Sequence, residues 1–84
     1  MNDLEVKVLG LGCAKCESLE RMVHSIMTDA GIEGKLEHVR DPNEIASYGI
    51  LPTPALVING EVKSAGKVPQ EKQVLLWLQQ AVDR

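Results

Sequence analysis

Residues 4–16 read LEVKVLGLGCAKC, and this stretch decides the fold because it joins a strand, a turn and the start of a helix. Apolar and charged residues alternate over residues 4–9, as in a half-buried strand. Two glycines mark a turn, and beyond it the apolar residues recur at helical spacing. These are Leu19, Met22, Val23, Ile26, Met27 and Ala30. The stretch therefore predicts a strand over residues 4–9 and a helix over residues 13–30 that Gly31 ends.

A second strand and a short helix are predicted next. Residues 35–39 form the strand, with a weaker apolar pattern. The segment Asp41-Pro42-Asn43-Glu44 then combines a good N-cap, a proline suited to the first helical position and an acidic residue at the third. We expect a helix from this segment to about Tyr48, ended by Gly49.

A hairpin and a last helix complete the predicted elements. The apolar run over residues 55–58 predicts a strand buried on both faces. Asn59-Gly60 is a strong signal for a two-residue hairpin turn, so residues 61–65 return antiparallel with Val62 facing the core. Pro69 suits the first position of the last helix. The apolar stripe of that helix consists of Val74, Leu75, Leu78 and Val82.

The predicted order is β-α-β-α-β-β-α in a single domain, residues 1–84. Connections through helices favour parallel strand pairing in the first half, and the hairpin requires antiparallel pairing in the second. We therefore expect an α/β fold with a mixed four-stranded sheet and helices on both faces.

Composition and charge argue against some classes of function. The net charge of −3 comes without a basic stripe, so nucleic acid is not an expected partner. The chain begins without a basic and apolar leader, and no apolar run approaches the ~18 residues of a membrane span. We expect a monomer in the cytoplasm that does not bind membranes. In that compartment, a lone pair of cysteines two residues apart indicates catalysis or metal binding rather than a structural disulfide.

Cys13 and Cys16 are the candidate catalytic residues. A helix N-terminus offers unpaired N–H groups and a positive dipole end, and both lower the pKa of a thiol. Cys16 shares a helix face with Leu19, so we expect it to point inward and Cys13 to be exposed. Cys13 would attack a substrate disulfide, and Cys16 would then release the reduced substrate. Lys15 either adds favourable charge beside the thiolate or is a solvated cation.

Thr53-Pro54 is the candidate substrate-binding segment. A cis peptide bond has a low cost only before proline. A cis bond at Pro54 would expose the Thr53 backbone beside the cysteines, where a peptide could add as a strand. The alternative is that Pro52 and Pro54 only stiffen a loop. Together with the cysteine pair, the sequence favours the cis interpretation.

The chain resembles the thioredoxin-fold oxidoreductases, most closely the small, glutaredoxin-sized redox-active disulfide thioredoxins of archaea and bacteria. The resemblance is carried by Cys13-Ala14-Lys15-Cys16, Thr53-Pro54-Ala55, the hairpin of residues 57–62 and Gly66, and it spans about residues 4–82. It implies a thioredoxin-like fold, with Cys13 as nucleophile, Cys16 as resolving cysteine and Pro54 as cis-proline.

The same resemblance implies dithiol–disulfide exchange with client proteins that contain disulfides, without a bound cofactor. It also suggests a flavoenzyme of the thioredoxin reductase type as electron donor. The Ala-Lys dipeptide between the cysteines, where classical thioredoxins carry Gly-Pro, leaves the direction of the reaction open.

Two other classes share parts of this pattern. Heavy-metal-associated domains also place such a cysteine pair at the start of a first helix, so a copper or zinc carrier is the alternative. Its topology ends on a strand, whereas this chain is predicted to end on a helix. A zinc site that adds His24 and His38 lacks the usual ligand spacing, and we expect no metal site. A non-catalytic interaction module would predict that Cys16→Ser has no effect.

Overall fold

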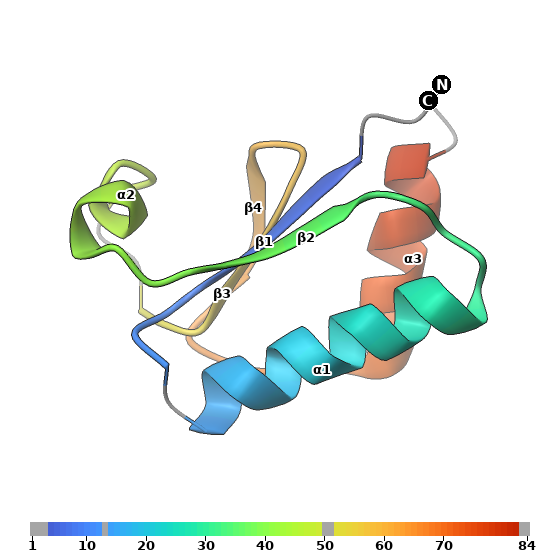
Figure 1. Cartoon of the computed structure of the whole chain (residues 1–84), viewed down its shortest axis with the longest axis horizontal. Coiled ribbons are helices and arrows are strands. Elements are labelled where there is room, and N and C mark those ends of the chain that lie inside the picture. The colour runs from blue at the N-terminus through green and yellow to red at the C-terminus, as the bar shows by residue number, and fades with distance from the viewer. Residues whose placement is uncertain (1–3, 13, 50–51, 83–84) are drawn as a thin grey trace.

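The computed structural model describes residues 4–12, 14–49 and 52–82, and Figure 1 shows its arrangement. Cys13 therefore lies outside the described residues. The elements are β1 (Glu5–Leu9), α1 (Ala14–Asp29), β2 (Lys35–Val39), α2 (Pro42–Ala46), β3 (Ala55–Ile58), β4 (Glu61–Ala65) and α3 (Glu71–Val82). This order confirms the predicted β-α-β-α-β-β-α sequence of elements.

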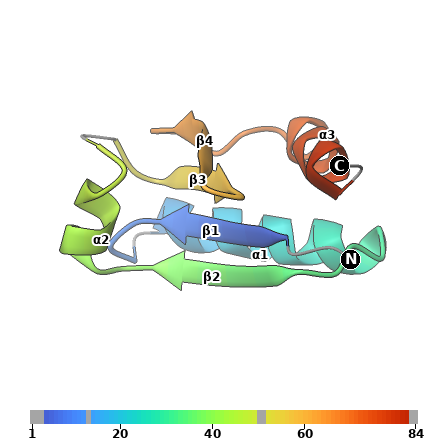
Figure 2. The same cartoon turned by 90° about the horizontal axis from the view of Figure 1, so that it is seen from above.

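The strands form one mixed sheet in the order β2-β1-β3-β4. β1 pairs in parallel with β2 and antiparallel with β3, and β3 pairs antiparallel with β4. Figure 2 shows β1 and β2 running in the same direction and ending beside α2. Asn59 and Gly60 both have positive φ, 52° and 81°, as a two-residue hairpin turn between β3 and β4 requires.

Side chains pack on both faces of the sheet, in two hydrophobic cores. The larger core lies under α1 and α3 and includes Val6, Val8, Leu19, Val23, Leu56, Ile58, Val74 and Leu78. The smaller core lies under α2 and consists of Leu9, Val39, Ile45, Ala55 and Val57. All four residues of β3 are buried, which confirms the prediction of a strand covered on both faces.

The helix ends follow the predicted signals. The N–H of Gly31 donates to the carbonyl of Thr28, and the N–H of Ile32 donates to that of Met27. With φ of +66° at Gly31, this is a Schellman ending for α1. The Asp41 side chain accepts from the N–H of Asn43 at 3.0 Å and so caps α2.

Two local predictions are wrong. Val62 is 36% exposed rather than directed into the core, and Ser64 is the buried residue of β4. Val62 pairs with Val57 on the sheet face of α2, but it lies on an edge strand where the smaller core does not cover it. α3 begins at Glu71 rather than at Pro69, because the carbonyl of Gln70 accepts the first helical hydrogen bond.

No helix in the described part of the chain combines the length and the apolar character needed to cross a membrane.

Candidate active site

The start of α1 and the carboxyl end of β1 lie at the same end of the sheet (Figures 1 and 2). Cys16 lies in the first turn of α1 and is fully buried, on the face that also buries Leu19 and Val23. This confirms the prediction that Cys16 points inward. The predicted exposure of Cys13 falls outside the described residues.

Gly10, directly after β1, forms the wall against which the sulfur of Cys16 packs. A Cβ built on Gly10 would lie 2.1 Å from Cys16 Sγ and 3.8 Å from the Cβ of Thr53. The sulfur therefore occupies the space that a side chain would need at this position. Gly10 is held by its own N–H, which donates to the carbonyl of Val39 at 3.0 Å. Two of the candidate residues, Cys16 and Thr53, thus lie close to the same glycine.

The segment with Thr53 leads directly into β3. The peptide bond between Thr53 and Pro54 is cis, and Pro54 is fully buried. The carbonyl of Pro54 accepts a hydrogen bond of 2.9 Å from the N–H of Gly66. A Cβ on Gly66 would lie 3.0 Å from Pro52 Cγ, so this glycine allows the two segments to approach. Thr53 is therefore placed by the buried, hydrogen-bonded Pro54 that directly precedes β3.

A polar contact that the sequence did not predict lies behind Gly10. His38 Nδ1 is 3.0 Å from Glu20 Oε1, and His38 Nε2 is 3.2 Å from the Gly10 carbonyl oxygen. The His38 side chain is only 6% exposed. The sequence contained one usable signal, because Glu20 lies one helical turn after the inward-facing Cys16. The position of His38 beside Gly10 depends on strand register, which sequence periodicity does not specify.

A second cation lies near the site in addition to Lys15. Lys15 is exposed on α1. Arg40 follows β2, and its Nη1 lies 3.0 Å from where a Cβ on Gly12 would be. The Arg40 guanidinium therefore lies beside the residue that precedes Cys13 in the chain. Sequence analysis missed Arg40 because it is 27 positions from Cys13.

A charged cluster lies on the other face of β1. Lys7 Nζ is 3.6 Å from Glu44 Oε2 on α2. A hydrogen bond to the Tyr48 side chain, with smaller contributions from the charges of Glu44 and Glu37, raises the pKa of Lys7 above its ordinary value. This cluster links β1 to α2.

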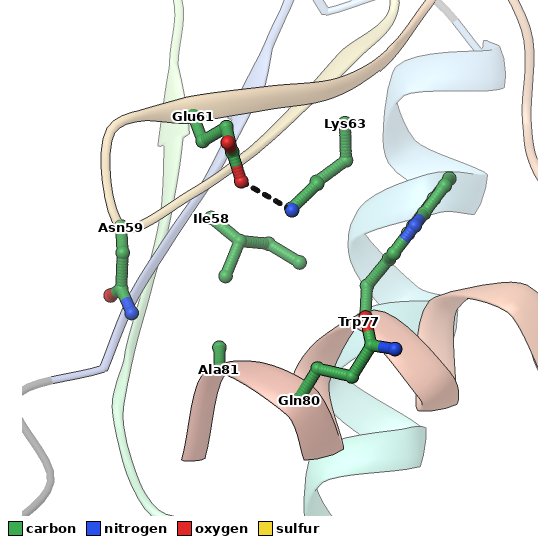
Figure 3. Close-up of a pocket in the computed structure, with 7 residues that line it drawn as sticks. All are labelled: Ile58, Asn59, Glu61, Lys63, Trp77, Gln80 and Ala81. Atoms are coloured by element: carbon green, nitrogen blue, oxygen red, sulfur yellow. Dashed lines mark hydrogen bonds and ion pairs between the residues drawn. The ribbon is translucent and has the colours of Figure 1, made fainter. Parts of the chain in front are cut away.

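A separate pocket lies between the β3–β4 hairpin and α3 (Figure 3). Lys63, Trp77 and Gln80 are among its lining residues, and Lys63 pairs with Glu61. Ile58 also lines the pocket. It is the last residue of β3, whereas Pro54 directly precedes the first residue of that strand. The pocket is therefore not part of the candidate active site. Within the described ranges, no three His, Cys, Asp or Glu side chains are grouped so as to hold a metal ion.

Comparison with known proteins agrees with this arrangement. Residues 4–79 match the model of the thioredoxin domain family. The chain belongs to this family. It is 27% identical over 71 residues to a thioredoxin of Methanothermobacter thermautotrophicus, covering 84% of this chain and 92% of that protein. It is 28% identical over 69 residues to a thioredoxin of Methanocaldococcus jannaschii, covering 82% of this chain and 79% of that protein.

These findings confirm the predicted resemblance and the thioredoxin-like α/β fold. Family membership also supports a role of the thiol–disulfide oxidoreductase kind.

Proposed function

We propose that the chain is a thiol–disulfide oxidoreductase that uses Cys13 and Cys16 to exchange a dithiol for the disulfide of a client protein. The observation that carries this proposal is the fully buried Cys16 in the first turn of α1, with its sulfur against Gly10 and close to Thr53. A shielded second thiol is suited to intramolecular attack, because it meets the first cysteine more readily than an external disulfide.

The exchange has two steps. In the first, the Cys13 thiolate attacks one sulfur of the client disulfide, that S–S bond breaks, and the other client sulfur leaves as a thiolate that takes up a proton. In the second, the Cys16 sulfur, after losing its proton, attacks Cys13 in the mixed disulfide. A Cys13–Cys16 disulfide forms, and the second client sulfur leaves and is protonated. Two electrons and two protons have then passed from the cysteine pair to the client.

The supporting residues have separate roles in this proposal. The N-terminus of α1 favours the Cys13 thiolate through its dipole and N–H groups. Lys15 adds positive charge in the same turn. The backbone of Thr53, in the segment fixed by Pro54, receives the client chain as an added strand. Electrons return to the pair from a flavoenzyme of the thioredoxin reductase type, and the protein acts as a cytoplasmic monomer without a bound cofactor.

The test compares the two cysteine variants on a synthetic peptide with one disulfide and a fluorophore that is quenched until reduction. Cys13→Ser removes the nucleophile and is expected to abolish reduction. Cys16→Ser is expected to accumulate a mixed disulfide with the peptide, detected as an added mass in intact-protein mass spectrometry. A Cys16→Ser protein that turns over at the wild-type rate would refute the two-cysteine mechanism. A wild-type protein that reduces no disulfide would refute the function.

A further inference from the structure

We propose that His38 is a positioning residue for the cysteine pair and acts on it through Gly10. This inference rests on the proposed function, since it assigns His38 a role in the exchange chemistry of that same pair. His38 touches neither the substrate nor the reacting sulfurs in this proposal. It fixes and polarises the wall against which Cys16 packs.

The His38 ring joins three elements at one point. His38 lies on the edge strand β2, Glu20 lies on α1 one turn after Cys16, and Gly10 follows β1. The ring contacts Glu20 Oε1 at 3.0 Å through Nδ1 and the Gly10 carbonyl at 3.2 Å through Nε2. We call these two contacts the Glu20–His38–Gly10 bridge. The His38 side chain is 6% exposed and the Glu20 side chain 37% exposed, so the contact to the Gly10 carbonyl is the better shielded from water.

The strength of the bridge depends on which ring nitrogens carry a proton. A carbonyl oxygen only accepts hydrogen bonds, and so does an ionised carboxylate. Both contacts are therefore hydrogen bonds at the same time only when both ring nitrogens carry a proton, which is the imidazolium form. A neutral ring has one N–H and keeps one of the two bonds. A ring N–H that donates to the Gly10 carbonyl places the positive end of a dipole against the Gly10 peptide.

Other charged groups share the elements that surround the ring. They are Lys15, Glu17, Arg21, His24 and Asp29 on α1, Glu5 and Lys7 on β1, Lys35 and Glu37 on β2, and Arg40 directly after β2. None of these has the pair of buried contacts that the His38 ring makes to the cysteine helix and to Gly10.

The bridge is coupled to Cys16 through direct contact between Gly10 and the sulfur. Because a Cβ on Gly10 would lie 2.1 Å from Cys16 Sγ, the Gly10 backbone and the sulfur are in direct contact. A shift of Gly10 changes the space available to the sulfur. The positive end of a donated N–H dipole behind Gly10 favours a thiolate over a neutral thiol, and therefore favours the reduced pair over the disulfide. Removal of the ring is expected to shift the equilibrium toward the disulfide.

The first test measures that equilibrium in dithiothreitol buffers at pH 7, with alkylation and intact mass to count the thiols. His38→Leu replaces the ring by an apolar side chain that makes no hydrogen bond. We expect its disulfide to be favoured threefold to tenfold over that of the wild type, where tenfold corresponds to ~30 mV. His24→Leu is the matched control, because His24 is an exposed histidine on α1, and it should titrate as the wild type.

Rescue separates this role from simple packing. In His38→Gln, the amide nitrogen reaches about the position of Nε2 and can donate to the Gly10 carbonyl. It should recover part of the shift, whereas Leu should not. A His38→Leu protein that folds and titrates within twofold of the wild type would overturn the inference. A wild-type pair that forms no intramolecular disulfide would instead overturn the proposed function, so the two failures are distinguishable.

A second measurement needs no variant and covers the case in which His38→Leu does not fold. In wild-type protein with ¹⁵N-labelled histidine, the ring resonances of His38 should shift between the oxidised and the reduced states. Those of His24 should remain in place and serve as the internal control. Unchanged His38 resonances would overturn the inference, because a residue coupled to the pair must sense its reduction.

Discussion

Gly10→Ala is the most direct test of the geometry around Cys16. The new Cβ would lie 2.1 Å from Cys16 Sγ, whereas atoms in ordinary contact are about 3.5–4.0 Å apart. The sulfur or the backbone must therefore move by about 1.5 Å to relieve the clash. Gly10 does not have a positive φ, unlike Gly12, so the substitution introduces a steric clash without backbone strain. Overpacking of this kind typically costs about 1–3 kcal/mol.

We expect a loss at the upper end of this range, because the Gly10 backbone is fixed on both sides. Its N–H donates to Val39 and its carbonyl accepts from His38. Cys16→Ala removes the clashing atom, and the nearest remaining contact is Cys16 Cβ at 3.3 Å. In that background, Gly10→Ala should cost less than about 1 kcal/mol. The resulting coupling energy of ~2 kcal/mol lies within the range measured for residues in contact.

The assay is urea unfolding of the four reduced proteins in this cycle, followed by circular dichroism. Equal costs of Gly10→Ala in the wild-type and the Cys16→Ala backgrounds would refute the proposed contact. The single variant should also reduce a peptide disulfide about 100-fold more slowly, because displacements of about 1 Å have effects of that size.

Gly34→Ala is the matched control for this experiment. A Cβ at Gly34 would lie 2.8 Å from Leu4 Cβ, a comparable clash far from the cysteines in sequence. It should destabilise the fold by a similar 1–3 kcal/mol. Its cost should be independent of Cys16→Ala, and the exchange rate of the folded protein should be unchanged. A Gly34→Ala protein with the same loss of exchange would show that Gly10→Ala acts through general destabilisation.

Three further predictions concern stability, measured by urea or thermal unfolding. Asp41→Ala removes the cap of α2 and should cost about 1 kcal/mol; an unchanged midpoint would contradict the capping role. Ser64 Oγ is buried without a hydrogen-bond partner among the described residues, so Ser64→Ala should be neutral or stabilising by up to about 1 kcal/mol. The pKa of Lys7 is raised by Tyr48, so its stabilisation is present below the unfolded value near 10.5 and is lost as pH rises through the folded value. The stability difference between wild type and Lys7→Met should therefore shrink from pH 8 to pH 11.5, and a constant difference would contradict this linkage.

The sequence predicted the parts of the fold that depend on local patterns. Alternation located β1, and helical spacing located α1 and predicted that Cys16 points inward. The N-cap residue Asp41 and the turn Asn59-Gly60 act over a few residues, so their geometry could be predicted without knowing the tertiary structure.

The parts of the structure that could not be predicted depend on strand register and on which part of the sheet the helices cover. Val62 was expected in the core because it alternates correctly, but alternation does not show which part of a sheet face a helix covers. His38 reaches Gly10 because it pairs with Val8, two positions before that glycine. Arg40 lies beside Gly12 because of where β2 ends relative to β1, and this proximity cannot be read from a separation of 28 positions in the sequence.

The burial of Cys16 also favours exchange over metal transport. A copper or zinc carrier passes its ion between thiolates, so both sulfurs must be reached by the ion and by an incoming ligand. Disulfide exchange needs only one accessible sulfur, since the second attacks from within the protein. Cys16 is fully buried and packed against Gly10, so the site fits disulfide exchange better than metal transport. Reduced protein should therefore lose Zn²⁺ to a competing chromogenic chelator, and tight 1:1 retention that depends on Cys16 would favour the carrier.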